Sequence, residues 1–296
     1  MIVSTHRVSL VCTHILMREW IDTFTSVFKD ERGSFKDGVC LDVKGMLSFL
    51  WCIGLACEPV GLAPNPTGFG EKSDWKHIEK LKEDVRDALL ISNGDETLRT
   101  LEKLELIDAL QRLGIDYLFK NEIERVLNGA NGAFENKANS VLDNDVHYKS
   151  LYFRLLRQHG YEVSHDIFSV FKDERGNFKD GVCLDVKGML SLYEASHLGF
   201  EGEETMYKAM AFATKNLMLI DDDDDDGNIE QSLKEEVSHA LELPLHWRMP
   251  RLDVRWQIDV HNIKYMAKYP SLLELAKLDF NMVQAIHQKE LAHMSR

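Results

Sequence analysis

Apolar residues recur at helical spacing through most of the chain from residue 74 onward, and this periodicity limits what the chain can fold into. Between residues 74 and 90 the apolar positions lie three or four residues apart: Ile78, Leu81, Val85 and Leu89. This spacing puts them on one face of an α-helix, and Asp74 stands where an N-cap is expected. The segment is therefore predicted to be a helix with one buried face.

The same pattern returns in later segments. Turn-forming residues separate them, at Asn93-Gly94, at Gly114 and at Asn128-Gly129, where a short helix over 119–128 is expected to end. The Asn-, Gly- and Asp-rich stretch 129–145 is predicted to be a long polar loop. The further apolar stripes are Leu98, Leu101, Leu104, Ile107 and Leu110; Tyr148, Leu151, Tyr152 and Leu155; Val182, Val186, Met189 and Leu190; Met206, Met210, Phe212 and Leu217; and Leu272, Leu275, Leu278 and Val283.

The rest of the sequence also favours helices over strands. Sustained alternation of Val, Ile and Thr, which would indicate strands, is absent from the sequence, and only six prolines interrupt it. The predicted fold class is all-α, with about ten helices. Helical hairpins of similar length, stacked in sequence, favour an α/α-barrel or bundle over a long coiled coil.

One segment of the chain occurs twice. Residues 26–50 read SVFKDERGSFKDGVCLDVKGMLSFL and residues 169–193 read SVFKDERGNFKDGVCLDVKGMLSLY, identical at 22 of 25 positions. The differences are Ser34/Asn177, Phe49/Leu192 and Leu50/Tyr193. A solenoid needs at least about three stacked repeats, so a partial duplication or an error in the gene model explains the pair better. One copy is expected to belong to the fold and the other to be a passenger.

The predicted domain organisation follows from these patterns. Residues 1–50 form an extra N-terminal segment, 51–73 an irregular linker with three prolines, and 74–296 the helical domain. The most apolar run, 46–57, is shorter than the roughly 20 residues that span a bilayer, so no membrane span is expected. We interpret it as a buried helix end or an adhesive apolar junction.

Charge and cysteine content exclude some functions. The formal net charge of −14 argues against a nucleic-acid partner, which a basic face would bind. The five cysteines are an odd number, and two of them, Cys40 and Cys183, are copies of each other. They do not read as a disulfide framework, so reduced thiols in an intracellular compartment are expected.

The run Asp221–Asp226 is the most conspicuous candidate for metal binding. It contains the pattern Asp-Asp-x-x-Asp, but six adjacent like charges disfavour a helix and Gly227-Asn228 follows, so a solvated loop is predicted. The run also fits the start of an EF-hand calcium loop, yet Leu233 occupies the position that requires a bidentate Glu. Only weak, adventitious cation binding is expected there.

The other candidates are interpreted as structural. Cys52 and Cys57 have no companion pair for a zinc site, and His159 and His165 are expected at the surface. The stretch His246-Trp247-Arg248 lies between two prolines and is expected to pack between helices and cap them. The sequence therefore assigns no catalytic, cofactor-binding or metal-binding residue.

Several long stretches resemble the N-terminal domain of plant terpene synthases. The stretch 246–256 is most similar to the monoterpene-synthase branch of the family, and together the motifs cover roughly residues 75–296 in family order. The motifs are LELIDALQRLG (104–114), FRLLRQHGY (153–161), DVKGMLSLYEA (185–195), HWRMPRLDVRW (246–256) and LLELAKLDFN (272–281).

The resemblance implies a helical α/α-barrel domain that does not itself carry out the chemistry. In the family, diphosphate leaves geranyl diphosphate in a lyase reaction, and a C-terminal domain with Asp-Asp-x-x-Asp and Asn/Asp-Ser/Thr-Glu helices holds magnesium or manganese. This sequence stops near where that domain usually begins, and the tandem-arginine motif of the family is missing, since no Arg-Arg pair occurs.

The chain is therefore expected to be truncated and catalytically incomplete alone, with no cofactor of its own. The catalytic domain would be its partner, covalently or in trans, through an apolar face around Leu275, Leu278, Val283 and Ile286. The alternatives are a non-enzymatic interaction or dominant-negative module, and a pseudogene product. The resemblance places the protein in the plastid, with the cytoplasm as the alternative.

Overall fold

The computed structural model describes residues 72–90, 96–136, 144–220, 230–260 and 267–294. The chain divides into two compact units, Met1–Glu58 with Ile286–Arg296, and Pro59–Ala285. The contacts described below all lie within the second unit. The predictions for residues 1–50, for the linker up to residue 71, for Cys52 and Cys57 and for Asp221–Asp226 fall outside the described residues, whereas residues 72 and 73 of the predicted linker already belong to a helix.

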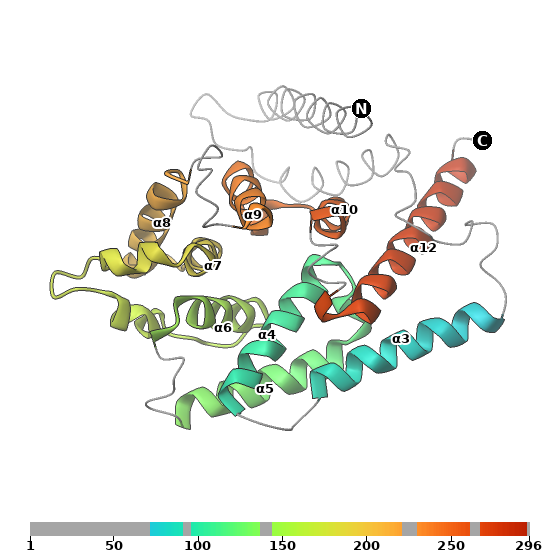
Figure 1. Ribbon diagram of the computed structural model, residues 1–296, viewed down its shortest axis with the longest axis horizontal. Coiled ribbons are helices and arrows are strands. Elements are labelled where there is room, and N and C mark those ends of the chain that lie inside the picture. Colours follow the sequence, from blue (N-terminus) through green and yellow to red (C-terminus); the bar gives the residue numbers. More distant parts are fainter. Residues whose placement is uncertain (1–71, 91–95, 137–143, 221–229, 261–266, 295–296) are drawn as a thin grey trace. The chain divides into compact units, whose positions relative to one another are not determined.

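Within the described ranges the secondary structure is helical (Figure 1). Strands do not form in this part of the chain, where Lys172 and Phe178 make a single isolated bridge. The all-α prediction is confirmed. The α-helices are α3 (Lys72–Leu90), α4 (Glu96–Arg112), α5 (Lys120–Asn136), α6 (Val146–Gln158), α7 (Val186–Ser196), α8 (Glu204–Leu217), α9 (Gln231–Glu242), α10 (Pro250–Val260) and α12 (Pro270–Met294), and the 3-10 helices are η1 (Asp116–Leu118), η3 (His165–Phe171), η4 (Asp180–Leu184) and η5 (Leu245–Trp247).

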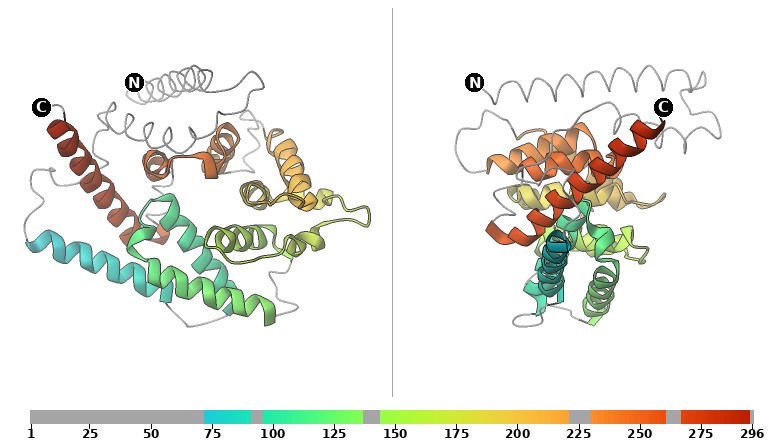
Figure 2. Two further views of the ribbon diagram at one scale, coloured as in Figure 1. Left: turned by 180° about the vertical axis from the view of Figure 1, so that it is seen from behind. Right: turned by 90° about the vertical axis from the view of Figure 1, so that its right-hand side faces the viewer.

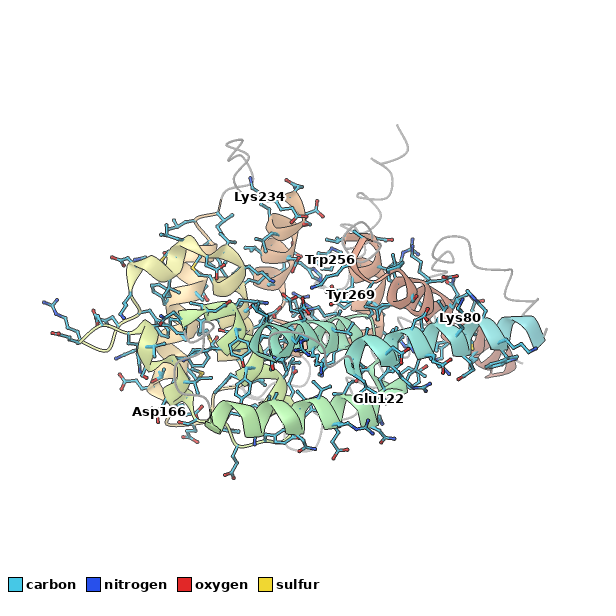
Figure 3. The ribbon with its side chains drawn as sticks, turned by 60° about the horizontal axis from the view of Figure 1, so that its bottom comes forward. Lys80, Glu122, Asp166, Lys234, Trp256 and Tyr269 are labelled. Atoms are coloured by element: carbon cyan, nitrogen blue, oxygen red, sulfur yellow. The ribbon has the colours of Figure 1, made fainter. Side chains whose placement is uncertain are left out.

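Helices that follow one another along the chain pack together. Helix α6 packs against α7, and α7 against α8, while α4 contacts both α6 and α10 (Figures 1 and 2). Helix α3 packs on α5, where Arg86 Nε donates to Glu122 Oε1 at 3.1 Å; Figure 3 labels Glu122. None of the described helices is both long and apolar enough to cross a membrane.

Most of the predicted apolar stripes form the core. All four stripe residues of α3 are buried, as are Leu104, Ile107 and Leu110 of α4. Two expectations were wrong. Leu98 is 51% exposed because it lies in the first turn of α4, and Leu275 is buried in the core, so it does not belong to an exposed face of α12.

Two predicted helix boundaries were also wrong. Helix α3 begins at Lys72, so Asp74 lies inside its first turn instead of capping it. Helix α5 does not end at Asn128-Gly129 but continues to Asn136. Packing of α5 on α3, α4 and α6, which buries Ile123, Leu127 and Ala130, outweighs the cost of about 1 kcal/mol that each of the two glycines imposes within the helix.

The second copy of the duplicated segment is mostly not α-helical. Residues 169–184 form 3-10 turns and a tight loop, and the α-helix begins only at Val186, so the stripe predicted from Val182 spans two elements. In the loop, Asp173 Oδ1 accepts from the backbone N–H groups of Arg175 and Asn177, and Gly176 has a φ of +77°. Asp185 then starts α7 by accepting from Gly188 N at 2.9 Å.

Helix α10 approaches the end of α4 closely at a glycine. Gly114, just after the end of α4, has a φ of +66°, which glycine adopts without strain. A Cβ at this position would also lie 2.8 Å from Val254 Cγ2 of α10. Gly114 therefore lets α10 approach the end of α4, where the charged residues described next are found.

Candidate functional site

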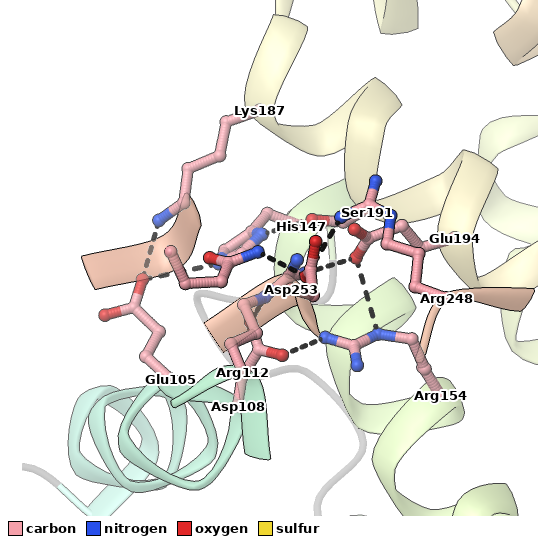
Figure 4. Close-up of polar contacts among 11 residues, drawn as sticks. Glu105, Asp108, Arg112, His147, Arg154, Lys187, Ser191, Glu194, Arg248 and Asp253 are labelled. Atoms are coloured by element: carbon pink, nitrogen blue, oxygen red, sulfur yellow. Dashed lines mark hydrogen bonds and ion pairs between the residues drawn. The ribbon is translucent and has the colours of Figure 1, made fainter. Parts of the chain in front are cut away.

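Four charged side chains, two of them almost fully buried, gather where α4, α6 and α7 meet (Figure 4). Helix α4 contributes Asp108 and Arg112, α6 contributes Arg154, and α7 contributes Glu194. The side chains of Arg154 and Glu194 are only 2% and 3% exposed. We call these four residues the ion network.

The ion network is a ring in which the charges alternate. Arg154 Nη2 donates to Asp108 Oδ1 at 2.6 Å, and Arg112 Nε donates to Asp108 Oδ2 at 2.9 Å. Arg112 Nη2 donates to Glu194 Oε2 at 2.6 Å, and Arg154 Nε lies 3.6 Å from the same oxygen. With two guanidinium groups and two carboxylates, the ring carries no net charge, which lowers the cost of burying it.

The surroundings hold the network in its ionised form. Burial alone would raise the pKa of Asp108 and of Glu194, but the neighbouring Arg112 and Arg154 outweigh it and lower both pKa values. The pKa of Arg112 is raised, because its two carboxylate partners outweigh its burial. Asp108, Glu194 and Arg112 therefore do not exchange protons near neutral pH, which makes them unsuited to acid–base catalysis.

A second polar group continues from the network through α9 and α10. Asp253 Oδ1 accepts from His239 Nε2 at 2.6 Å, and its Oδ2 accepts from Gln257 Nε2 at 2.9 Å and from Arg248 Nη1 at 3.4 Å. These bonds outweigh the burial of Asp253 and lower its pKa to about 2. The ring of Trp256, labelled in Figure 3, stacks on His239 with centroids 3.8 Å apart.

Residues 246–248 were predicted to pack between helices, and His246 and Trp247 lie in different surroundings. His246 Nε2 donates to the backbone oxygen of Glu194 at 3.1 Å, which joins η5 to α7. Burial, helped by the charge of Arg154, lowers the pKa of His246 to about 4, so this imidazole is neutral at pH 7. Trp247, in contrast, is 66% exposed, and its ring lies edge-on to the ring of His197 with centroids 6.4 Å apart.

Another trio has the residue types of a hydrolase triad. His147 Nδ1 lies 2.7 Å from Ser191 Oγ, and its Nε2 lies 3.3 Å from Glu105 Oε1. Ser191, however, is buried within α7, where the backbone N–H groups are bonded inside the helix and cannot form an oxyanion hole. Glu105 also accepts from Lys187 at 2.6 Å, so the trio joins helices and lacks the setting for hydrolysis.

Comparisons with known proteins identify what these helices belong to. Residues 64–241 match the family model described as "Terpene synthase, N-terminal domain". This chain belongs to the terpene synthase family. It is 52% identical over 220 residues to (−)-alpha-terpineol synthase of Vitis vinifera, covering 74% of this chain and 35% of that protein.

Other relatives support the same family membership. The chain is 48% identical over 231 residues to the chloroplastic alpha-thujene synthase TPS3 of Litsea cubeba, covering 76% of this chain and 37% of that protein. A crystal structure of isoprene synthase from grey poplar leaves (Populus x canescens), in complex with three Mg²⁺ ions and dimethylallyl-S-thiolodiphosphate, matches with a TM-score of 0.68 and 41% identity. That match covers 76% of this chain and 41% of the poplar chain. The chain thus spans little more than a third of the curated relatives it matches.

The residues described here do not fit the magnesium ions found in that relative. Across the described ranges, His, Cys, Asp and Glu side chains do not form a group of three or more that could hold a metal ion. The chemistry of the donors explains this, because the carboxylates of Asp108 and Glu194 each face guanidinium groups. A divalent cation would have to displace an arginine from a buried position.

The structure also places the remaining candidates. His159 is exposed and lies 3.0 Å from Gln111, and His165 is partly buried beside Asp166. The ion network was not predicted as a unit, although all four of its residues stand in the family-like stretches. The sequence does contain a signal for buried charges, though not for their partners, because Asp108, Arg154 and Glu194 each lie among apolar residues of a predicted helix that are buried in the structure.

Proposed function

We propose that this chain supplies the helical N-terminal domain of a monoterpene-type terpene synthase. In this proposal the domain is a folded support, and a diphosphate-releasing lyase reaction on geranyl diphosphate takes place in another part of the complete enzyme. The family match over residues 64–241 and the monoterpene synthases among the relatives support it.

The observation that carries the proposal is the state of the buried carboxylates. Release of pyrophosphate requires metal ions or other cations to stabilise the departing charge. Asp108 and Glu194 are already neutralised by Arg112 and Arg154, and their pKa values are lowered. Their chemistry suits holding helices together, and we propose that the chain alone does not ionise an allylic diphosphate.

The direct test is an assay of the purified chain with geranyl diphosphate and Mg²⁺ or Mn²⁺. We expect no terpene in the extract above a protein-free control, while a complete terpene synthase assayed in parallel gives product. Circular dichroism establishes that the assayed chain is helical. A metal-dependent product from the chain alone would overturn the proposal.

The partner implied by the family is a catalytic domain. The relatives are longer single chains, so in them the two regions are covalently joined. Association in trans is the alternative for this chain, and co-expression with a separate catalytic domain tests it. If product formation does not exceed that of the catalytic domain alone, association in trans is wrong.

A non-enzymatic interaction or dominant-negative module remains a second candidate. It predicts a complex with a full-length homologue, and a pull-down at micromolar concentration tests it. Retention of the homologue together with reduced synthase activity would support this candidate over a supporting domain. Absence of a complex would exclude it.

We further propose that the protein acts in the plastid. Several monoterpene synthase relatives are named chloroplastic. A fluorescent fusion to the C-terminus of the full chain, expressed in leaf cells, should coincide with chlorophyll fluorescence. Uniform cytoplasmic fluorescence would contradict the plastid assignment.

A further inference from the structure

Two nearly identical segments of this chain compete, in principle, for one position in the fold. The copy 169–193 packs in the helical body, and the copy 26–50 lies outside the described residues. Because 22 of 25 residues are the same, local sequence preference cannot decide between them. The contacts of the described copy show which residues can.

Most anchoring contacts of 169–193 would be available to either copy. Phe178 stacks on Phe212 of α8 with ring centroids 5.3 Å apart, and Lys187 Nζ donates to Glu105 Oε1 of α4 at 2.6 Å. The other buried residues of the segment include Phe171, Val182, Met189 and Leu190. The first copy has the same residue at each of these positions: Phe28, Phe35, Val39, Lys44, Met46 and Leu47.

The local turn and cap are shared as well. Asp173 and Gly176 close the loop, and Asp185 caps α7 next to Gly188, where a Cβ would clash with the cap carboxylate. All four residues are unchanged in the first copy. Asn177 is exposed and bonds to Asp173 through its backbone, so a serine serves there equally well.

The residues that flank the two copies differ, and those that flank the described copy are buried. One residue before the repeat, Phe168 is fully buried edge-on against Phe153, with centroids 5.2 Å apart; the first copy has Thr25. One residue after the repeat stands Glu194 of the ion network; the first copy has Trp51.

Of these two differences, the one between Glu194 and Trp51 has the larger consequence. Glu194 Oε2 accepts from Arg112 Nη2 at 2.6 Å, and Arg154 Nε lies 3.6 Å away. With Trp51 in its place, two buried guanidinium groups would share the single carboxylate of Asp108, which leaves a positive charge uncompensated. An indole would also have to fit between them.

Two differences inside the repeat also favour packing of the second copy, 169–193. Leu192 is fully buried, and the larger ring of Phe49 would overpack its position. Tyr193 packs edge-on against His197 with centroids 4.6 Å apart, and Leu50 would lose this contact. These effects are local adjustments of packing, whereas the loss of Glu194 unbalances the charge of the whole network.

We infer that Glu194 selects which copy of the duplicated segment occupies the surface formed by α4, α6 and α8. A segment of this sequence packs on this surface when a carboxylate follows it, and packing of 26–50 there is disfavoured because Trp51 follows it. With the carboxylate supplied, the surface would accept the first copy from the same chain or from a second copy of this chain, by domain swapping.

Carbodiimide cross-linking of the full chain tests the inference without altering the body. The reagent joins an amine to a carboxylate that touches it, so Glu105 should link to Lys187 in the natural chain and to Lys44 wherever the first copy is accepted. Mass spectrometry separates the products in the natural chain and in the variants below, because residues 52–57 read CIGLAC and the corresponding residues 195–200 read ASHLGF. Lys268 Nζ, 3.0 Å from Glu105 Oε2, gives an internal standard.

The decisive variant transfers the anchors to the first copy: Thr25→Phe, Phe49→Leu, Leu50→Tyr and Trp51→Glu. The matched control carries the first three changes with Trp51→Gln. Glutamine has nearly the same shape as glutamate but carries no charge. We expect the ratio of the Lys44 to the Lys187 link to rise about tenfold or more with Glu and less than about threefold with Gln, since an uncompensated buried charge is strongly disfavoured.

Three results would overturn the inference: a Lys44 link as abundant as the Lys187 link in the natural chain, no rise in the Glu variant, or an equal rise in the Gln control. The substitutions leave residues 168–194 unchanged, so the natural copy can still complete the body in either variant. Adding Glu194→Gln to the Glu variant should raise the ratio further, to above one. Light scattering then shows whether the accepted copy comes from the same chain or from a second one.

Discussion

Arg154 and Arg255 both hold carboxylates, but in different surroundings. The side chain of Arg154 is 2% exposed and lies 2.6 Å from Asp108, while that of Arg255 is 32% exposed and lies 3.0 Å from Asp259, four residues along α10. Water solvates and screens the surface pair, whereas the protein alone must compensate the buried charges. Similar distances therefore do not mean similar contributions to stability.

The difference also concerns what remains when one partner is removed. Without Arg255, Asp259 is still solvated, because its side chain is 53% exposed. Without Arg154, Asp108 and Glu194 would share the single guanidinium of Arg112. The ion network is a unit whose members depend on one another, and the surface pair is not.

The strongest way to break the network is Arg154→Met. We expect the free energy of unfolding to fall by about 3–5 kcal/mol, because an uncompensated buried carboxylate remains. Urea denaturation followed by circular dichroism measures the loss. Arg255→Met is the matched control, and equal losses for the two substitutions would refute the distinction between buried and surface pairs.

The histidine beside the network should make stability depend on pH. The pKa of His246 is lowered to about 4, so between pH 6.5 and pH 4 the unfolded state binds more protons than the folded state. Stability should fall as the pH falls through this window, by up to about 3 kcal/mol for this residue. His246→Gln should flatten the profile there, and an unchanged profile would contradict the lowered pKa.

Asp253 has the same proton preference as His246 but in a more acidic window, because its unfolded form also binds the proton more tightly than its folded form. Its pKa is lowered to about 2, so it stabilises the folded state above the unfolded pKa of about 4 and loses this effect as the pH falls toward 2. Asp253→Asn should cost about 2 kcal/mol at pH 7 and progressively less below pH 4. Thermal melts of both proteins from pH 7 to pH 3 should converge; parallel curves would argue against this linkage.

The smallest effect is expected at the surface pair. Arg255→Gln should change the free energy of unfolding by less than about 0.5 kcal/mol, because exposed pairs within a helix contribute little. The difference should shrink in 1 M salt, where the Debye length is about 3 Å. Urea midpoints at low and high salt check this, and a salt-independent loss above about 1 kcal/mol would mean that Arg255 acts through packing.

The sequence predicted the helices better than it predicted the polar site. The stripes of α3, α6 and α12 were recognised because apolar residues recur on one helical face. The end of α5 was missed because Asn128-Gly129 is a turn signal in isolation, whereas packing of the whole helix on α3, α4 and α6 keeps the segment helical. The ion network was missed because a charged residue within a helix gives no sign of partners more than 40 residues away, such as Arg154 for Asp108.

The amino-acid sequence by itself determined the all-α class, the helical stripes and the family, because these depend on residue spacing and on motifs that can be read locally. Only the tertiary structure decided which charges meet and what they do. Glu194 looks like any helical glutamate until α4 and α6 bring Arg112 and Arg154 to it. The two copies of the duplicated segment carry the same local information, so the choice between them rests on buried partners outside the segment, where an unpaired charge is most costly.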